Sequence, residues 1–400
     1  MRRKVPLGDL FRVGSSKRVL QSQWKSVGVP FFRGREITRL ATEGFVDNEL
    51  FISEDLYAAF AAKYGVPSAG DIMITAIGTI GNSYIVRDAD RFYFKDASVL
   101  WLKKTAEVSS DFVNLWLKSP LFFDQLDKGN GATVDTLTIQ KLQSVVIDLP
   151  PLEEQLQIVG ILDEAFDGIA TAKANAEKNL QSARALFESH LDLVLTRRGK
   201  DWTETTLGKA TGGVSTGPFG SLLHKRDYVE NGIPLVNPAH ITETGIEPDL
   251  RKTVSSESTV RLSAYVMREG DIVIGRRGEM GRCALVTSVE DGWLCGTGSF
   301  FIKPSEVCDT SYLVRFLRSQ GCREALEKLA GGAVMPNLSN VALSNLRFHL
   351  PPLDVQREIL RDIDVLHEET QRLESLYQQK LAALDELKKS LLHQAFSGAL

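Results

Sequence analysis

The chain has 400 residues, of which 43% are hydrophobic and 24% charged, and it carries a net charge of −4 at pH 7. These values are typical of a soluble protein of two or three domains, and no run approaches the ~20 apolar residues of a membrane helix. Because no apolar run follows the basic residues 1–4, we expect no signal peptide, no membrane contact and a cytoplasmic location. The four cysteines form no Cys-x-x-Cys pair, which indicates reduced thiols and no metal site.

The charge is unevenly distributed along the chain. Residues 1–150 hold 19 Lys and Arg against 17 Asp and Glu, and residues 200–350 hold 17 of each. Residues 151–199 hold 5 against 8, and residues 351–400 hold 6 against 9. Residues 1–150 and 200–350 can therefore present a basic face. The acidic segments 151–199 and 351–400 are expected to bind something other than phosphate.

Strand and helix signals follow one another in the same order in both halves. Apolar runs bounded by Gly or charged turns predict strands, and apolar residues at helical spacing predict a helix before the last strand. In the first half the strands are predicted at 71–75, 83–86, 92–102 and 145–149, and the helix over 112–126. In the second half the strands are predicted at 272–274, 284–287, 299–303 and 346–350, and the helix over 312–329.

A long amphipathic segment follows each half. The double proline of a Leu-Pro-Pro-Leu block ends a strand, and acidic residues in the next turn favour the start of a helix. Apolar residues then recur at heptad spacing, interrupted in the second segment by Thr370 and Lys380, which predicts an antiparallel coiled coil of helices ~40 residues and ~60 Å long. The predicted seam residues, which also form the expected partner surface, are Leu162, Phe166, Ile169, Leu180 and Phe187 in the first helix and Ile363, Leu366, Leu373, Tyr377, Leu384, Leu387 and Leu391 in the second.

The two halves share sequence motifs at a separation of 200 to 204 residues. Gly-Asp-Ile-Met-Ile at 70–74 corresponds to Gly-Asp-Ile-Val-Ile at 270–274, and a Gly-x-x-Gly turn follows each. Leu-Pro-Pro-Leu at 149–152 recurs at 350–353, while the side chains between these motifs differ. A duplicated frame has pseudo-two-fold symmetry, which suits a DNA duplex with two half-sites or a pair of protein partners.

These patterns predict an α+β fold in which two mixed α/β domains form a pseudo-two-fold repeat joined by a long antiparallel coiled coil. The predicted domains span 1–150 and 199–350, and the predicted helices span 151–198 and 351–400.

Basic residues in the loops of the two halves are the candidates for contact with DNA. An arginine can bond O6 and N7 of a guanine together, whereas Lys, Ser and Thr mostly hold phosphates. Arg33 and Arg35 flank a glycine, Lys17 and Arg18 end a Gly-Ser-Ser loop, and Arg276 and Arg277 lie beside the duplicated turn. The candidates are Lys17, Arg18, Arg33, Arg35, Thr75, Lys225, Arg226, Arg276 and Arg277. For any one of them the alternative is a solvated surface side chain.

The order of motifs, a globular part, Leu-Pro-Pro-Leu-x-x-Gln-x-x-Ile, a long helix and then all of these again, resembles the DNA specificity subunit of type I restriction–modification systems. The resemblance spans the whole chain and includes Gln155, Gln356 and the Gly-Ile-Pro at 232–234. The second copy has Asp-Val-Gln at 354–356 where the first has Glu-Glu-Gln, so the Glu-Gln pair is intact only once.

The resemblance implies that each globular part is a target recognition domain that reads one half of an asymmetric, bipartite site in double-stranded DNA. It implies that the helices set the spacing and dock two methyltransferase subunits, which motor–nuclease subunits join. The specificity subunit itself is not an enzyme and holds no cofactor, so S-adenosylmethionine, ATP and magnesium are expected in the partner subunits. Because the loops of the two halves differ, we expect them to read different bases.

The same patterns bear on two other functions. A stand-alone adenine methyltransferase needs an Asn/Asp-Pro-Pro-Tyr/Phe turn, and the chain has none; it also lacks the Gly-x-x-x-x-Gly-Lys-Ser/Thr loop of an ATPase. A duplicated coiled-coil scaffold that binds only proteins remains open, and it differs from a specificity subunit in selecting no DNA sequence.

Overall fold

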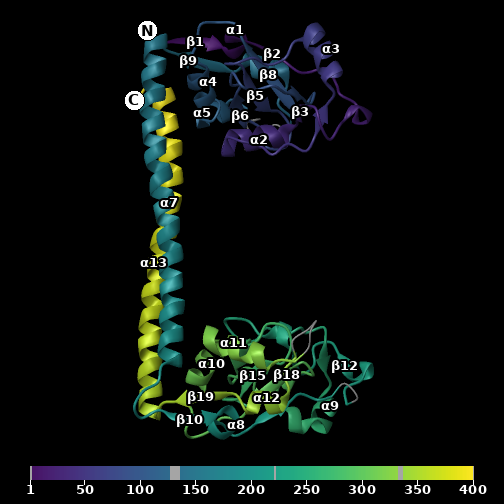
Figure 1. Ribbon diagram of the computed structural model, residues 1–400, viewed down its shortest axis with the longest axis vertical. Helices are drawn as coiled ribbons and strands as arrows, with labels where there is room; N and C mark the ends of the chain where they lie inside the picture. Colours follow the sequence, from purple (N-terminus) through teal and green to yellow (C-terminus); the bar gives the residue numbers. More distant parts are fainter. Residues whose placement is uncertain (1, 127–135, 220–221, 332–336, 400) are drawn as a thin grey trace. The chain divides into compact units, whose positions relative to one another are not determined.

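The computed structural model describes residues 2–126, 136–219, 222–331 and 337–399, and it divides into two compact units. Unit 1 comprises Met1–Glu177 and Gln378–Leu400, and unit 2 comprises Lys178–Tyr377. Each unit contains one globular part and a segment of both long helices, α7 (Leu152–Thr196) and α13 (Leu353–Ser397), as the colours of Figure 1 show.

Each unit is built on a four-stranded antiparallel sheet of the same order. In unit 1 the order is β2 (Phe11–Gly14), β8 (Val99–Lys104), β5 (Ile72–Thr75) and β6 (Ser83–Ile85). In unit 2 it is β11 (Val214–Thr216), β18 (Ser299–Ile302), β15 (Ile272–Gly275) and β16 (Cys283–Leu285). The duplicated Gly-Asp motif therefore begins the third strand of both sheets, and the Gly-x-x-Gly turn joins that strand to the edge strand.

The third strand is buried on both faces, and a separate core lies against each face. Because successive side chains of a strand point to opposite faces, Ile72 and Ile74 pack in one core with the long helices while Met73 packs in the other. In unit 2, Ile272 and Ile274 lie likewise in one core and Val273 in the other. A strand that is buried on both faces needs a continuous run of apolar residues instead of an alternation of apolar and polar residues.

Each unit also has a pair of short parallel strands that end at the same edge. In unit 1, β3 (Val29–Phe32) pairs with β4 (Phe51–Ile52) and runs parallel to β7 (Tyr93–Phe94). In unit 2, β13 (Leu235–Val236) runs parallel to β17 (Leu294–Cys295), and β12 (Tyr228–Val229) pairs with β14 (Thr253–Val254). The residues that directly follow two parallel strands emerge at the same edge of the sheet, and this edge carries part of the candidate interface described below.

Short helices surround the sheets of both units. Unit 1 has α1 (Leu7–Leu10), α2 (Gly34–Glu43), α3 (Glu54–Tyr64), α4 (Ser110–Trp116), α5 (Pro120–Asp124), α6 (Ile139–Ser144) and η1 (Gln21–Gln23). Unit 2 has α8 (Leu207–Ala210), α9 (Ser256–Arg261), α10 (Thr310–Arg318), α11 (Gln320–Leu329), α12 (Asn340–Ser344), η2 (Lys225–Asp227), η3 (Pro238–His240) and η4 (Ser263–Tyr265). None of the helices in the described ranges is long and apolar enough to cross a membrane, and all four cysteines are buried and unpaired.

A buried glutamine fastens the start of each long helix to its globular part. A terminal strand pair, β1 (Arg3–Pro6) with β9 (Val146–Leu149) or β10 (Thr203–Thr206) with β19 (Arg347–Leu350), leads into the double proline. Gln155 donates to the carbonyl of Pro150 at 2.8 Å and accepts the Ser109 N–H at 2.9 Å, next to the first turn of α4. Gln356 repeats this with the Pro351 carbonyl and the Asp309 N–H at the start of α10. The glutamine of Leu-Pro-Pro-Leu-x-x-Gln is therefore a structural fastener.

The aspartate of each Gly-Asp motif is likewise structural. Asp71 is buried and accepts hydrogen bonds from the indole of Trp101 and the N–H groups of Ser68 and Lys104. Asp271, also buried, accepts from the Arg268 N–H and from the Lys303 ammonium group at 2.6 Å. Both carboxylates hold the turn before the central strand, which explains why this motif is shared while the surrounding loops differ.

The two long helices run antiparallel within each unit, as predicted. In unit 1, Lys388 lies 4.8 Å from the ring centre of Phe166, and further along α7 Lys173 pairs with Asp385. In unit 2, Arg184 makes two bonds to Glu374, at 3.0 and 3.1 Å.

The predicted seam residues divide into three groups. Leu162, Ile169 and Ile363 are buried; Phe166, Leu180, Phe187, Leu366, Tyr377, Leu384 and Leu391 are half-buried; Leu373 and Leu387 are exposed. The seam assignment of Leu373 and Leu387, which are 43% and 46% exposed, therefore needs correction. A straight helix drifts from a seven-residue repeat, and the polar Thr370, expected to interrupt the seam, is buried with its hydroxyl bonded to the Leu366 carbonyl.

Replacing Gln155 with Leu should destabilise unit 1. The change leaves the buried Ser109 N–H and Pro150 carbonyl without their partner, which costs about 2–6 kcal/mol at 1–3 kcal/mol for each of the two unsatisfied groups. Hydrogen–deuterium exchange of residues 109–117 under native conditions measures the loss. Gln157→Leu, at an exposed position of the same helical turn, is the control and should change stability by no more than about 0.5 kcal/mol. Equal protection in both variants would contradict the fastening role of Gln155.

Candidate nucleic-acid interface

A shallow pocket of about 480 Å³ in unit 1 is lined by four basic side chains. Arg33 and Lys95 directly follow the parallel strands β3 and β7, and the Lys95 N–H bonds to the Phe32 carbonyl, so both emerge at the same edge. Arg35 and Arg39 add a second row from α2, where residues four apart share a helix face. The remaining lining residues come from α2, the turn after β5 and the segment before β8; they are Gly34, Thr38, Ile77, Gly78, Thr79 and Ser98.

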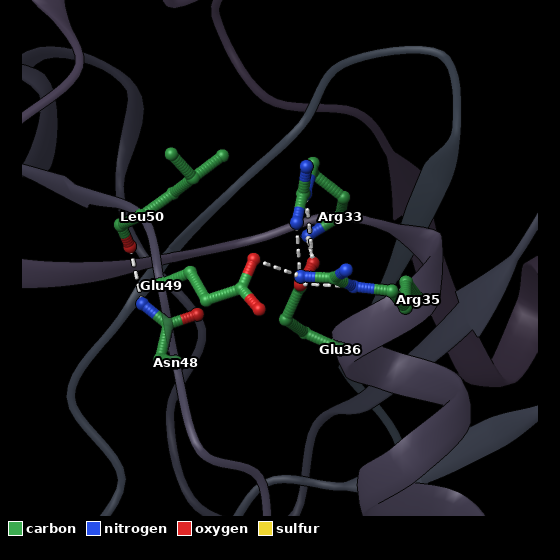
Figure 2. Close-up of polar contacts among 6 residues, drawn as sticks. All are labelled: Arg33, Arg35, Glu36, Asn48, Glu49 and Leu50. Carbon is green, nitrogen blue, oxygen red and sulfur yellow. Dashed lines mark hydrogen bonds and ion pairs between the residues drawn. The ribbon is translucent and has the colours of Figure 1, made fainter. Parts of the chain in front are cut away.

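A buried carboxylate organises two of these arginines (Figure 2). Glu36, in the first turn of α2, is 1% exposed and accepts the backbone N–H of Arg33 at 2.8 Å. It also accepts Nε and Nη2 of Arg33 at 3.1 and 2.7 Å, and Nε of Arg35 at 3.0 Å. Nη2 of Arg35 reaches the exposed Glu49 at 2.7 Å. The chain order Arg-Gly-Arg-Glu thus forms one local ion-pair network at the mouth of the pocket.

The network keeps Glu36 ionised. Burial raises the pKa of Glu36, but the hydrogen bonds and charges of Arg33 and Arg35 outweigh it and bring this pKa to about 2. The hydrogen bond from Arg35 also lowers the pKa of Glu49. Because the folded-state pKa of Glu36 lies below its ordinary value, its stabilising effect is complete above that ordinary value and is lost as the pH falls toward about 2. At neutral pH Glu36 and Glu49 are therefore both ionised.

The other candidates of unit 1 have different environments. Lys17 and Arg18 are exposed, and Arg18 pairs with Asp96, the neighbour of Lys95, at 3.1 Å. These two residues therefore lie beside the segment that carries one wall of the pocket. Thr75 is 1% exposed, and its hydroxyl bonds to the Thr79 carbonyl inside its own turn. The assignment of Thr75 as a DNA-contacting residue is corrected on this ground, because a buried hydroxyl with an internal partner supports the turn instead.

In unit 2 the basic side chains come from the turn between β15 and β16. Arg277 is exposed. Arg276 is half-buried, with its guanidinium 5.5 Å from the ring centre of Phe300 and its Nε bonded to Asn337 at 3.2 Å. Burial, and to a lesser degree the charge of Arg277, lowers the pKa of Arg276. Arg276 is therefore anchored by its own unit, while Arg277 presents its charge to solvent.

The basic side chains occupy different positions in the two units. By strand register and motif alignment, the position of Arg277 is occupied in unit 1 by Ile77, which is 46% exposed. The position of Arg33 is occupied in unit 2 by Asn237, and that of Lys95 by Gly296. A Cβ atom on Gly296 would lie 2.3 Å from Oδ1 of Asn237, so no larger residue fits there without rearrangement. The two units thus carry their positive charge on different segments of the same arrangement of strands.

Lys225 and Arg226 lie apart from this turn. They are exposed on η2, which is held to α9 through Asp227, an acceptor for Ser258 at 3.2 Å and for Arg261 at 3.0 Å. Among the described residues of unit 2, no hydrogen bond or ion pair joins them to Arg276 or Arg277.

The sequence did not single out two basic residues of the unit 1 pocket, Arg39 and Lys95, or the buried Glu36 that bonds to Arg33 and Arg35. Arg39 had a usable signal, since it stands four residues after Arg35, a spacing that places two side chains on one face of a helix. Lys95 had none, because the parallel pairing of β3 with β7 cannot be read from residues more than sixty positions apart. Glu36 looks like an ordinary helix-capping glutamate until the structure shows its burial.

Comparisons with known proteins agree with this architecture. The family model described as "Type I restriction modification DNA specificity domain" matches residues 3–180 and 220–382. A Haemophilus influenzae protein predicted to be a type I restriction enzyme specificity subunit is 32% identical over 47% of this chain and 48% of its own length. The Escherichia coli EcoBI specificity subunit is 22% identical over 68% of this chain and 62% of its own length. The chain thus matches only about half to three-fifths of the length of these relatives.

A solved structure shares the fold along the chain. The HsdS subunit of Thermoanaerobacter tengcongensis superposes with a TM-score of 0.65 at 19% identity, covering 100% of this chain and 97% of that one. This likeness concerns the fold, and the family model, which matches well over half of the residues in two blocks, supplies the assignment. The chain belongs to the type I restriction–modification DNA specificity family.

Proposed function

We propose that the chain is the non-catalytic specificity subunit of a type I restriction–modification complex and that each unit reads one half of an asymmetric, bipartite DNA site. One observation carries the proposal: the two units share a strand frame but carry their basic side chains on different segments of it. Arg33, Arg35, Arg39 and Lys95 line the pocket of unit 1, whereas Arg276 and Arg277 occupy the turn of unit 2. Two domains that share their strands but differ in their basic side chains are suited to recognise two different forms of one type of ligand.

The chemistry of these side chains suits the grooves of a DNA duplex. Arginine presents paired donors that match O6 and N7 of guanine in the major groove, and lysine holds phosphates as a point charge. The near-neutral globular segments concentrate positive charge locally, so base-edge contacts are expected to contribute sequence selectivity while partner subunits add contacts to the DNA backbone.

We further propose that α7 and α13 set the spacing of the half-sites and dock two methyltransferase subunits, to which motor–nuclease subunits are added. S-adenosylmethionine, ATP and magnesium would be bound by those partners. Exposed apolar side chains that recur along the helices support a docking role, since apolar patches left in water often mark protein-interaction surfaces. In unit 2 they are Leu186, Leu193, Val365, Leu373 and Leu376.

Selection of duplexes from a random pool by the complex of this chain with its methyltransferase tests the main proposal. We expect two short, different sequence clusters separated by unread base pairs, because two distinct units read them. A continuous or perfectly palindromic site would contradict the reading by two different units. A pool that emerges without any enriched sequence would identify the chain as a protein-binding scaffold.

Arg277→Ala should relax only the half-site read by unit 2. Loss of a bidentate contact to guanine costs about 1–3 kcal/mol at one base position, whereas loss of a phosphate contact weakens all sequences evenly and flattens the salt dependence by about one unit of slope. Binding to single-base variants across both half-sites measures the effect. Arg276→Ala serves for comparison, since it additionally removes the bond to Asn337. A change confined to the other half-site would refute this placement.

Leu373→Asp with Leu376→Asp should weaken the association with methyltransferase subunits by at least tenfold while unit 2 stays folded. Both side chains are already in water, at 43% and 57% exposure, so a carboxylate costs little until a partner buries it. Co-purification and thermal melting give the two readouts. Ala382→Asp, at an exposed position of the same helix, is the control. Native stoichiometry in the double variant would reject this docking face.

A further inference from the structure

The carboxylate of Glu36 has no capacity left for a ligand. Its Oε1 accepts Nη2 of Arg33 and Nε of Arg35, and its Oε2 accepts the backbone N–H and Nε of Arg33. A carboxylate offers about four acceptor positions, and all of them are occupied. With the side chain 1% exposed, Glu36 can influence a ligand only through the two arginines.

The bonds to Glu36 determine which edge of Arg33 is free. The Nε–Nη2 edge of the guanidinium grips both oxygens of Glu36, in the paired geometry that holds an arginine plane in one orientation. The hydrogens on Nη1 and the second hydrogen on Nη2 make no hydrogen bond within the described residues. Two adjacent donors therefore remain on a guanidinium that lines the pocket and is 27% exposed. That pair of donors matches O6 and N7 of a guanine.

Arg35 is held less firmly. One of its two partners is Glu49, whose side chain is 66% exposed, and Arg35 itself is 47% exposed. Exposed ion pairs of this kind contribute little stability and are readily exchanged for another anion. A phosphate can replace Glu49, whereas Glu36 cannot be replaced without opening the buried start of α2. Arg39 and Lys95 lie beside Arg35 in the same lining.

We propose that Glu36 is a positioning residue that holds Arg33 in the orientation for bidentate recognition of one guanine, while Arg35, Arg39 and Lys95 bind the neighbouring phosphates. This inference rests on the proposed DNA-reading function of unit 1. Fixing a long side chain during folding removes the entropy loss that would otherwise accompany its ordering on DNA, and it penalises bases that lack two acceptors in the major groove.

Unit 2 lacks this device. At the position of Glu36 it has His240, whose Nδ1 lies 2.9 Å from the Leu235 carbonyl, and Asn237 replaces Arg33. The guanine-reading arrangement is therefore specific to the half-site of unit 1.

The test uses the full chain with its methyltransferase partner and the duplex sequence selected by the wild type. Each guanine is replaced in turn by 7-deazaguanine, which lacks the N7 acceptor. Within the half-site read by unit 1, we expect one guanine whose replacement weakens wild-type binding about tenfold. This penalty should vanish in Arg33→Lys, which keeps the charge but loses the paired donors. It should fall several-fold in Glu36→Gln, and Glu36→Gln should have no further effect when added to Arg33→Lys.

Glu54→Gln is the matched control, since Glu54 also pairs with an arginine, Arg91, but outside the pocket; the 7-deazaguanine penalty should stay unchanged. If thermal melting shows that Glu36→Gln does not fold, Glu36→Asp, which shortens the carboxylate and keeps its charge, takes its place with the same readout. A penalty that survives in Arg33→Lys, or a Glu36 variant that weakens all duplexes equally with the penalty intact, overturns the inference. In either case sequence selection by the wild type still stands, whereas its absence would sink the proposed function itself.

Discussion

Burial of β5 and β15 on both faces is the constraint on which each unit depends. One face of the strand packs against the core that receives the long helices, and the other packs against the core beneath the small sheet. The side chains in the middle of the strand are all apolar, and the buried aspartate before it holds the preceding turn through hydrogen bonds. Each unit therefore has one side that packs on the long helices and one side whose loops differ between the two copies.

The residues that hold the fold together are distinct from those that differ between the two units. The duplicated residues Gln155, Gln356, Asp71 and Asp271 all bond to the protein itself. The residues that differ between the units, such as Arg33 against Asn237, lie at strand ends and turns outside the two cores. Exchanging those side chains does not disturb the packing that holds the frame, and this explains how one fold can present different basic side chains in its two copies.

Glu36 shows how a buried charge can orient neighbouring side chains as well as stabilise the fold. An unpaired carboxylate in its place would be costly, and burial by itself raises the pKa of Glu36, yet the two arginines keep it ionised. The same bonds that satisfy the carboxylate restrict the arginines. One network, formed by residues 33–36 and Glu49, thus both satisfies the buried carboxylate and orients the two arginines.

The sequence by itself determined the α+β class, the duplication and the antiparallel pairing of the long helices, because periodicity and repeated turn motifs are local and survive without knowledge of packing. It also located Arg33, Arg35 and the Arg276–Arg277 turn beside that frame. Only the tertiary structure revealed that Thr75 is buried, that Leu373 and Leu387 leave the seam, and that Lys95 joins Arg33 through the parallel pairing of β3 with β7. Burial and contacts between distant strands depend on the whole folded chain, so no local pattern encodes them.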